Sequence, residues 1–338
     1  MAIAKRLTAC FLGITSFVCW CGPMSLSFAA SPYYAKAKEE GRVLLYTSLA
    51  GADTKAFRTA FEKANPGVTL EIYRASGTTI LQKIMTESRA GTHVADAVMT
   101  EGPVLYALKD NNLLVKFDSP ERKAFDERFK DEEGYWTDVY PTVHSIAYNT
   151  KLVPPQNVPK HYTDLLDPRW KGKLGANRNN FMFTAIMLEF YGKEKGDEFL
   201  HKLAQQNPQV RSGGTLTATL VGAGELPIAF SINANNVDNV KESGSPVDWA
   251  RVEDPLYGEP HPAAVMARAP HPNAARLVVE FAISKEGQEL MSKLGKVPGR
   301  SDVQPKIGVD RSKLRIIARE DQAKTAYYQK MFDDLFGK

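Results

Sequence analysis

Hydrophobic and polar residues alternate along the chain with two periodicities, one that predicts strands and one that predicts helices, in turn. Short apolar runs at 42–47, 68–73 and 95–99 are typical of buried strands. Helical patterns follow them at 54–64, 79–90 and 103–110. Because strands that alternate with helices favour a parallel sheet covered on both faces, we expect an α/β fold.

The later patterns predict a second α/β block. Residues 118–140 and 152–170, rich in charge, aromatics or proline, are typical of surface connections. Strands are then predicted at 172–175 and 226–231, and helices at 181–191 and 195–205. A strand at 264–267 and a helix over 272–294 are expected to return to the first block, since two blocks joined by two crossings would form a cleft that opens and closes. We therefore predict domain I at 30–112 plus about 258–297, domain II at about 113–257, and a C-terminal helical segment at 298–338 that packs on the lobes.

The first 29 residues predict export. Lys5 and Arg6 precede an apolar run over 7–20, and Ser27-Phe28-Ala29 offers small residues at a cleavage site. The run is shorter than the about 20 residues of a membrane span. We expect a cleaved signal peptide at 1–29 and a periplasmic protein, with a lipidated Cys10 as the alternative.

Composition narrows the chemistry of the mature chain. All three cysteines lie in the leader, at Cys10, Cys19 and Cys21, so disulfides, thiolate metal sites and cysteine nucleophiles are excluded. Two of the 43 Lys and Arg residues also lie there, which leaves 41 against 39 Asp and Glu. This balance and the export signal argue against nucleic acid as a partner, and we expect a monomer without a cofactor.

Catalytic motifs are missing from the sequence. It contains no G-x-S-x-G, H-E-x-x-H or P-loop, and Gly222-Ala223-Gly224 lacks the last glycine of a dinucleotide-binding motif. The six histidines are scattered and not spaced as metal ligands. An enzyme or a metal centre is therefore not supported by any motif.

Three loops between a strand and a following helix combine an arginine with Ser, Thr, Asn or Gly, at 73–79, 176–180 and 211–215. Helix capping explains any one of them. Ligands of open α/β sheets bind outside the carboxyl ends of strands, where helix N-termini favour anions, so the recurrence favours an anion site. Residues at the ends of the first and third strands are expected to face the same crevice. Tyr46, Thr47 and Ser48 at the end of the first strand could instead form a turn, and Glu101 could instead hydrogen-bond the hinge. The chain is also expected to cross first between domains at 100–102. The candidate ligand-binding residues are Tyr46, Thr47, Ser48, Arg74, Ser76, Gly77, Thr78, Thr100, Glu101, Arg178, Asn179, Ser212, Gly213, Thr215, Asn233 and Asn235.

Several segments together resemble a known family: 43–48, 95–98, 147–153, 164–173, 224–229 and 272–276, with Asp164-Leu165-Leu166-Asp167-Pro168-Arg169-Trp170-Lys171-Gly172-Lys173 the most specific. They resemble the periplasmic solute-binding proteins of ABC importers, in the ferric-iron-binding branch of the family 1 extracellular solute-binding proteins. The resemblance implies a two-lobed, type II periplasmic-binding fold with a ligand cleft between its domains. It also implies hinge closure and delivery of a small-molecule ligand to an ABC permease in the inner membrane.

The ligand is where the chain departs from that branch. Iron-binding members carry two adjacent tyrosines after the strand equivalent to 228–230, and here the pair falls on Ala234 and Asn235. Neither side chain supplies a phenolate, whereas amides such as Asn233 suit an oxygen-rich solute. We expect a small anionic organic, phosphorylated or phosphonate solute. Ferric iron held by other donors such as Tyr46 or Tyr148, and an exported enzyme on the same scaffold, remain the alternatives.

Overall fold

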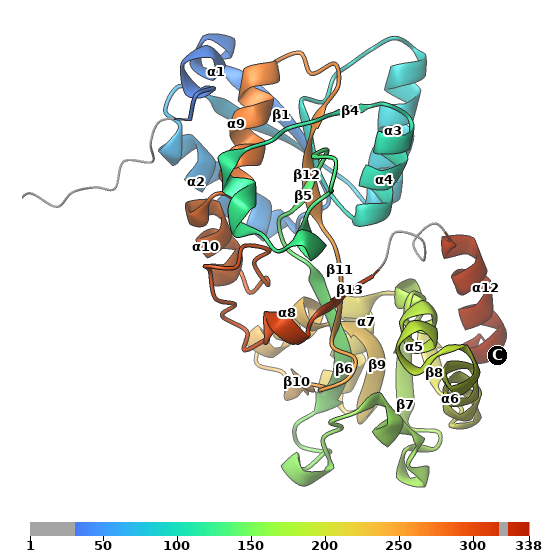
Figure 1. Ribbon diagram of the computed structural model, residues 1–338. Coiled ribbons are helices and arrows are strands. Elements are labelled where there is room, and N and C mark those ends of the chain that lie inside the picture. The colour runs from blue at the N-terminus through green and yellow to red at the C-terminus, as the bar shows by residue number, and fades with distance from the viewer. Residues whose placement is uncertain (1–30, 318–323, 338) are drawn as a thin grey trace, which may run out of the picture. The chain divides into compact units, whose positions relative to one another are not determined.

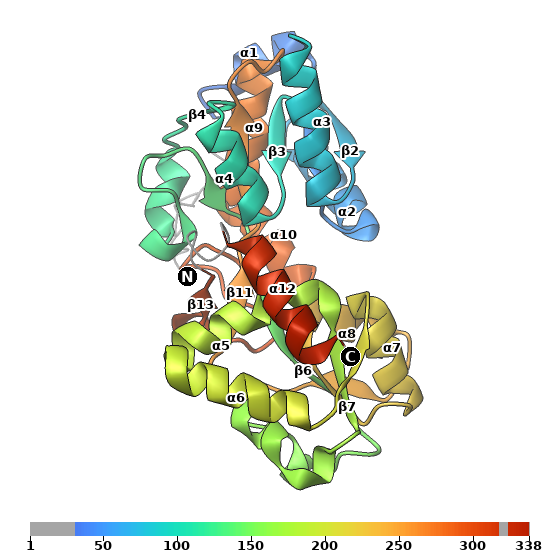
Figure 2. The ribbon, with the colours of Figure 1, turned by 90° about the vertical axis from the view of Figure 1, so that its right-hand side faces the viewer.

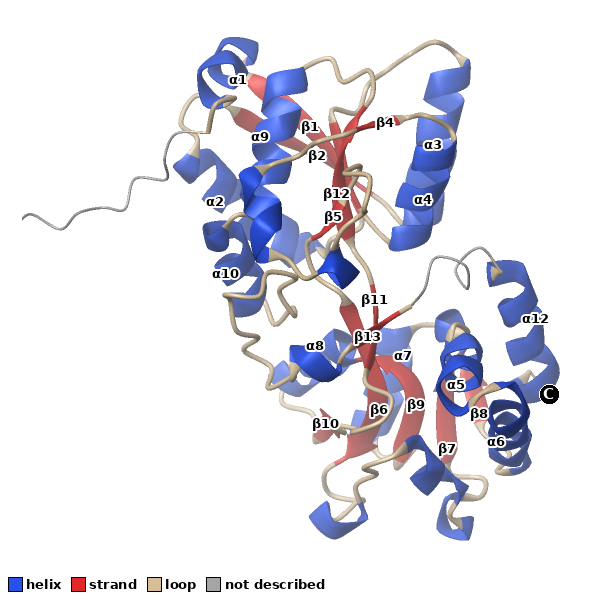
Figure 3. Cartoon of the chain, in the orientation of Figure 1, coloured by secondary structure: helices blue, strands red, loops and turns tan. Residues whose placement is uncertain are grey.

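The computed structural model describes residues 31–317 and 324–337, and its strands form two sheets (Figure 1). The first sheet has six strands in the order β2-β1-β3-β12-β4, with β5 paired to β12. The second has seven in the order β13-β11-β6-β9-β7-β8, with β10 paired to β6. The predicted α/β class is confirmed, as the alternation of helices and strands in Figure 3 shows. The predicted signal peptide at 1–29 lies outside the described residues.

Parallel strands make up one half of the first sheet. Its first three strands run parallel, so their carboxyl ends lie at one edge, and β12 runs antiparallel to β3, β4 and β5. The returning segment therefore supplies an inner strand, and β4 and β5 come from residues that the sequence assigned to domain II. The strands are β1 (Arg42–Thr47), β2 (Thr69–Arg74), β3 (Ala97–Met99), β4 (Leu114–Val115), β5 (Thr137–Asp138) and β12 (Pro262–Met266).

Helices cover both faces of the first sheet, with α1, α2 and α9 on one face and α3 and α4 on the other (Figures 1 and 2). Val43 and Leu45 of β1 pack in one hydrophobic cluster, and Leu44 and Tyr46 pack with another, as the two-residue period of a strand requires. The helices of this part are α1 (Tyr34–Glu40), α2 (Gly51–Ala64), α3 (Gly77–Arg89), α4 (Gly102–Asp110), α9 (Pro272–Ile283) and α10 (Lys285–Lys293).

The single helix predicted over 272–294 is wrong, because the chain breaks at Ser284. The Ser284 hydroxyl donates to Phe281 O at 2.8 Å and accepts the Gly287 N–H at 3.1 Å, so it ends α9 and caps α10. A Cβ on Gly287 would lie 2.0 Å from Phe281 O, which only glycine avoids.

The second sheet also has a parallel half. There β7 lies parallel to β8 and β9, so these three strands end at one edge, while β6 runs antiparallel to β9. The strands are β6 (Thr142–Asn149), β7 (Leu174–Asn177), β8 (Gln209–Arg211), β9 (Ile228–Asn233), β10 (Val247–Trp249), β11 (Tyr257–Glu259) and β13 (Arg315–Ile316). The helices are α5 (Phe183–Tyr191), α6 (Lys193–Gln205), α7 (Gly214–Ala223), α8 (Ala234–Glu242) and α12 (Thr325–Phe336). Short 3₁₀ helices are η1 (Pro120–Ala124), η2 (Glu127–Phe129), η3 (Pro155–Asn157), η4 (Tyr162–Leu166), η5 (Pro168–Trp170), η6 (Arg178–Asn180) and η7 (Arg311–Lys313).

The C-terminal segment contributes more than the helix that the sequence predicted. Its strand β13 pairs with β11 in the second sheet, and α12 packs against α5 and α6 (Figure 2). Phe332 and Phe336 of α12 are buried, and the Phe336 ring lies 5.6 Å from that of Phe230. The end of the chain is therefore part of the second sheet and of its core.

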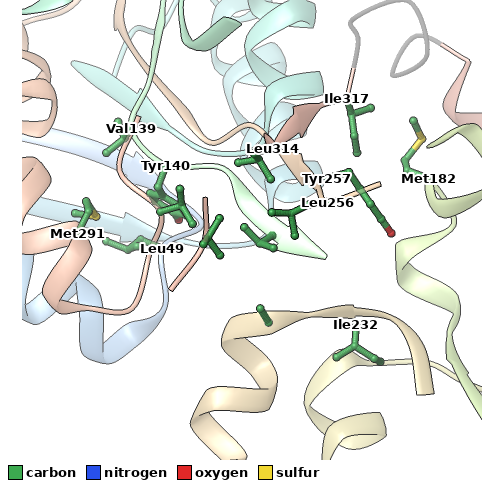
Figure 4. Close-up of a cluster of buried hydrophobic side chains, with 14 of the residues drawn as sticks. Leu49, Val139, Tyr140, Met182, Ile232, Leu256, Tyr257, Met291, Leu314 and Ile317 are labelled. Atoms are coloured by element: carbon green, nitrogen blue, oxygen red, sulfur yellow. The ribbon is translucent and has the colours of Figure 1, made fainter. Parts of the chain in front are cut away.

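The chain passes between the two sheets three times. Two crossings are short, at residues 139–141 and 260–261, and we call them the connecting segments; the third leads from the end of α10 to β13. Val139 and Tyr140 of the first segment lie near Leu49 and Met291 in a buried apolar cluster (Figure 4). The crossing predicted at 100–102 is wrong, since Gly102 begins α4 within the first sheet's layers. Its N–H instead donates to Pro260 O at 2.9 Å, so it lies beside the second segment. Among the residues that the structure describes, no helix has the length and apolar composition needed to cross a membrane.

Candidate functional site

A first polar group lies where β1, β2 and β3 end, and we call it the α3 group: Ser48, Ser76, Gly77, Thr100 and Glu101. The Thr100 hydroxyl lies 2.9 Å from the Ser48 hydroxyl and also contacts Glu101 Oε2. Ser76 caps α3, accepting the Thr79 N–H at 3.3 Å. Parallel strand ends thus bring together side chains from three loops; that they form a ligand edge stays a prediction.

The Glu101 carboxylate gives the α3 group a negative charge of its own. A Cβ on Gly77, the first residue of α3, would lie 2.1 Å from Glu101 Oε2. Glycine at this position therefore allows the carboxylate to approach the helix N-terminus, where the helix dipole stabilises it. This end of the site favours hydroxyl donors over a second anion.

A second polar group lies where β7, β8 and β9 end. We call it the α7 group: Asn177, Asn180, Gly213, Gly214, Ser231, Asn233 and Asn236. Asn177 Oδ1 accepts the N–H groups of Asn179 at 3.2 Å and Gly213 at 3.3 Å, and so joins two loops. A Cβ on Gly214, the first residue of α7, would lie 2.1 Å from Asn236 Nδ2. Amide side chains therefore surround the N-terminus of α7.

The end of β9 is tied to the loop that follows β7. Asn180 Nδ2 donates to Ser231 O at 2.7 Å and to Asn233 Oδ1 at 2.5 Å, and the Ser231 hydroxyl donates to Asn180 O at 2.7 Å. Ser231 has a φ of 58°, a left-handed conformation that is costly for a residue with a Cβ. The three hydrogen bonds hold this conformation and orient the amides, which are neutral donors and acceptors.

A run of titratable residues on and beside the connecting segments, with His144 and His261 buried and Glu259 partly exposed, lies between the two groups. His261 Nε2 lies 4.0 Å from Glu101 Oε1, and its Nδ1 lies 3.2 Å from the Thr142 hydroxyl. His144 Nε2 lies 3.8 Å from Glu259 Oε2, and His144 stands opposite Asn233 in the β6–β9 register. The run therefore leads from the α3 group to the α7 group.

Burial sets the protonation of this run. It lowers the pKa of His144 to about 3, with a smaller effect from nearby His261. Burial, and then the Glu101 charge, raise the pKa of Glu259 to about 7. Burial raises the pKa of Asp138 to about 8, although its carboxylate accepts the His261 N–H at 2.7 Å. Near neutral pH, both carboxyls therefore lie close to their titration points.

The three arginines predicted to gather in the crevice have partners elsewhere. Arg74 Nε donates to Leu49 O at 2.9 Å, and Arg178 Nε lies 2.8 Å from Asp333 Oδ1 of α12. Arg211 bonds Val210 O and Gln209 Oε1 at 3.0 Å each. Arg74 is thus tied to the loop after β1, Arg178 to α12 and Arg211 to its own strand, and the prediction of three convergent cations lacks support in these contacts.

Other predicted residues divide between the site and the core. Tyr46 and Thr47 were expected in the crevice, but both are buried: the Tyr46 hydroxyl donates to Glu87 Oε1 at 2.9 Å, and Thr47 Oγ1 accepts the Leu49 N–H at 3.1 Å. Asn235 lies with Pro141 and Lys296 around a small cavity near the first connecting segment. Thr78, Ser212 and Thr215 are exposed at the starts of α3 and α7.

Two possible metal donors lie away from the strand-end groups. Tyr46 is engaged by Glu87, as above, and Tyr148 lines a cavity of about 670 Å³ together with Trp249 and Arg251. Within 31–317 and 324–337, no three His, Cys, Asp or Glu side chains gather as a metal site.

Sequence reasoning missed the titratable run and part of the amide cluster. Asn177 and Asn180 lie in the segment 176–180 that the sequence had singled out, and Asn236 lies in the first turn of α8, but none of the three was chosen as a ligand residue. His144, Glu259 and His261 carried a signal that could have found them, since titratable residues inside apolar strand patterns must find partners or shift their pKa.

Comparison with known proteins adds a family to this geometry. The sequence model of a family described as bacterial extracellular solute-binding protein matches residues 93–318. The chain is 22% identical over 283 residues to an Fe(3+)-binding periplasmic protein of Serratia marcescens, which covers 79% of this chain and 80% of that protein.

Solved structures share the fold. Iron-bound HitA from Pseudomonas aeruginosa is 22% identical with a TM-score of 0.74, over 87% of this chain and 99% of that one. The periplasmic binding protein AfuA from Actinobacillus pleuropneumoniae, with fructose-6-phosphate bound, is 20% identical with a TM-score of 0.71, over 88% and 99%. At these identities the likeness concerns the fold, which is that of the type II periplasmic binding proteins.

Proposed function

Because the chain belongs to the bacterial extracellular solute-binding proteins, in the ferric-binding-protein-like branch that serves ABC importers, we propose that it captures a small, oxygen-rich organic anion such as a sugar phosphate. The observation that supports this ligand class is the α7 group, in which neutral amides and a hydroxyl surround the first turn of α7. Helix N-termini favour phosphate oxygens, and amides bond both phosphate and hydroxyl groups.

The α3 group supports a ligand with two unlike ends. Glu101 accepts hydrogen bonds, and the Ser48 and Thr100 hydroxyls both donate and accept them, so this group suits the hydroxyls of a sugar. The phosphate is then held at the α7 group, away from the Glu101 charge. AfuA, which has the same fold, was solved with fructose-6-phosphate.

We further propose that the protein works without a chemical step, as a periplasmic monomer that hands its solute to an inner-membrane permease. Contacts made by both groups at once favour a closed form over an open one. The expected division into domain I and domain II with a cleft between them is part of this proposal.

Ferric ion is the second candidate, because the Serratia relative and HitA are named for iron. The donor set argues against it here. The positions after β9 are Ala234 and Asn235, and the Tyr46 hydroxyl is buried against Glu87. Ferric ion prefers negatively charged oxygen donors. Among the residues of the α3 group and the α7 group, Glu101 is the one that carries such a donor.

The test is calorimetric titration of residues 30–338 with fructose 6-phosphate, a phosphonate and ferric citrate. Binding also stabilises the fold: at a free concentration one hundred times its Kd, the solute adds about 2.7 kcal/mol to the free energy of unfolding. We expect Asn233→Ala to weaken fructose 6-phosphate binding tenfold or more, since a hydrogen bond to a charged group contributes about 1.5–3 kcal/mol. Asn239→Ala, at an exposed asparagine of α8, is the control and should leave the affinity unchanged. Binding of ferric citrate alone, with a visible charge-transfer band, would overturn the proposal.

A further inference from the structure

Several titratable side chains gather on and beside the connecting segments. Asp138 and Tyr140 lie on or beside the first segment, and Glu259 and His261 on or beside the second. His144 and Tyr257 stack on each other at 5.0 Å, and Tyr140 and His261 at 4.9 Å. Two further groups face them from the first sheet's helices and loops: Glu101, and Lys296 paired with Asp53 at 3.1 Å.

Among the residues that the structure describes, the His144 ring is short of two hydrogen bonds, and Glu259 lies beside it. The His144 side chain is 3% exposed, and within the described chain neither of its ring nitrogens has a hydrogen-bond partner. Glu259 Oε2 is 3.8 Å from His144 Nε2, beyond hydrogen-bond range. A buried polar atom without a partner is unfavourable. With the imidazole proton on Nδ1, a proton on Glu259 would lie between Glu259 Oε2 and His144 Nε2 and give that nitrogen a partner after a small approach.

We propose that the His144–Glu259 pair is a proton-binding site, and that proton binding there and solute binding favour one another. The second half rests on the proposed function. The pair stands between two sources of negative charge: Glu101 of the α3 group, and an anionic solute beside Asn233, the register partner of His144. Either charge opposes the ionised form of Glu259, so the solute-bound protein keeps the proton to a higher pH.

The direction of the pH dependence follows from the free protein, in which the pKa of Glu259 is raised to about 7. Below that pH the proton is already bound, so the affinity for an anionic solute is level. Above it, binding must take up a proton, so the affinity falls by up to tenfold per pH unit. Lys296 has the opposite charge, but its ion pair with Asp53 compensates it. Asp138 is the other carboxyl of the cluster that binds a proton near neutral pH.

The proton site is tested first without any solute. Infrared difference spectra of the protein carrying ¹³C-labelled glutamate separate Glu259 from Asp138, which stays unlabelled. We expect a labelled carboxylic-acid band that disappears as the pH rises from about 6 to 8, and that is missing in Glu259→Gln. Glu225→Gln, at an exposed glutamate, is the matched control and should keep the band. Identical spectra for the wild type and Glu259→Gln would overturn the proposal.

The linkage is tested with fructose 6-phosphate at pH 8, where the phosphate is already a dianion. Titrations in buffers of different ionisation enthalpy give the number of protons taken up. We expect up to one proton more for the wild type than for Glu259→Gln, whose neutral amide mimics the protonated acid. Equal uptake by the two proteins would refute the linkage. If the wild type does not bind the sugar phosphate, the proposed ligand class is refuted instead, and the infrared band still decides the proton site.

Discussion

Asp96 is the residue whose removal we expect to weaken the first sheet most clearly. It lies just before β3, is 0% exposed, and accepts three hydrogen bonds. These come from Leu44 N at 2.8 Å, His271 N at 2.7 Å and His271 Nδ1 at 3.0 Å. The carboxylate therefore fastens the returning segment, at the start of α9, to β1 and β3.

Asp96→Ala removes all three bonds. Hydrogen bonds to a charged group contribute about 1.5–3 kcal/mol each. Because His271 is partly exposed and water can replace its bond to the carboxylate, we take the lower value for each bond and expect a loss of about 4.5 kcal/mol. The assay is urea unfolding at pH 7.5, followed by far-ultraviolet circular dichroism. The midpoint should fall while the slope stays the same, since the surface exposed on unfolding changes little.

A matched control separates this effect from the loss of any aspartate. Asp197 is 53% exposed and lies 3.5 Å from His201, one turn along α6. Exposed pairs of this kind contribute about 0–1 kcal/mol, so Asp197→Ala should leave the midpoint almost unchanged. A loss below about 1 kcal/mol for Asp96→Ala would show that the carboxylate does not fasten the returning segment, and the reasoning from its three bonds would be wrong.

Two further variants test the site and the connecting segments. Gly214→Ala places a Cβ 2.1 Å from Asn236 Nδ2, so calorimetry should show an affinity for fructose 6-phosphate lowered tenfold or more. The free energy of unfolding should change by less than about 1 kcal/mol, because alanine favours helix. Unchanged affinity would remove this turn from the site. For Asp138, whose pKa is raised to about 8 from 3.8, the unfolded chain ionises first, so the free energy of unfolding should fall as pH rises from about 4 to 8. Urea titrations between pH 5 and 8.5 should show a smaller fall for Asp138→Asn, and equal slopes for both proteins would contradict the shift.

Local patterns were enough to predict most elements of the parallel halves of the two sheets. The apolar run at 42–47 became β1 with the same bounds, because its alternate residues face two separate apolar clusters. The helix predicted over 79–90 is found as α3, which begins two residues earlier, at Gly77, directly after its cap Ser76. Such signals lie within a few residues of the feature they predict, so no tertiary information is needed.

Features that depend on distant residues were missed. His144 and Ser145 interrupt the apolar residues of β6, and the segment forms a buried strand because Ser145 bonds Ala250 O while β9, β10 and β11 flank it. Arg178 looked like a ligand residue until the structure placed it against Asp333 at the far end of the chain. A short strand such as β13 has no pattern of its own, since β11 supplies its hydrogen bonds.

The order of strands in the first sheet has a consequence for how the protein is made. β12 lies between β3 and β4, yet it leaves the ribosome roughly 150 residues after β4, about 8–30 s later at common synthesis rates. Until then β3 has an open edge. In the second sheet β6, β7, β8 and β9 are synthesised earlier than β12 and can pair with one another, although β11 and β13 come later. The half of the molecule that is synthesised first is therefore completed only after most of the other half has been made.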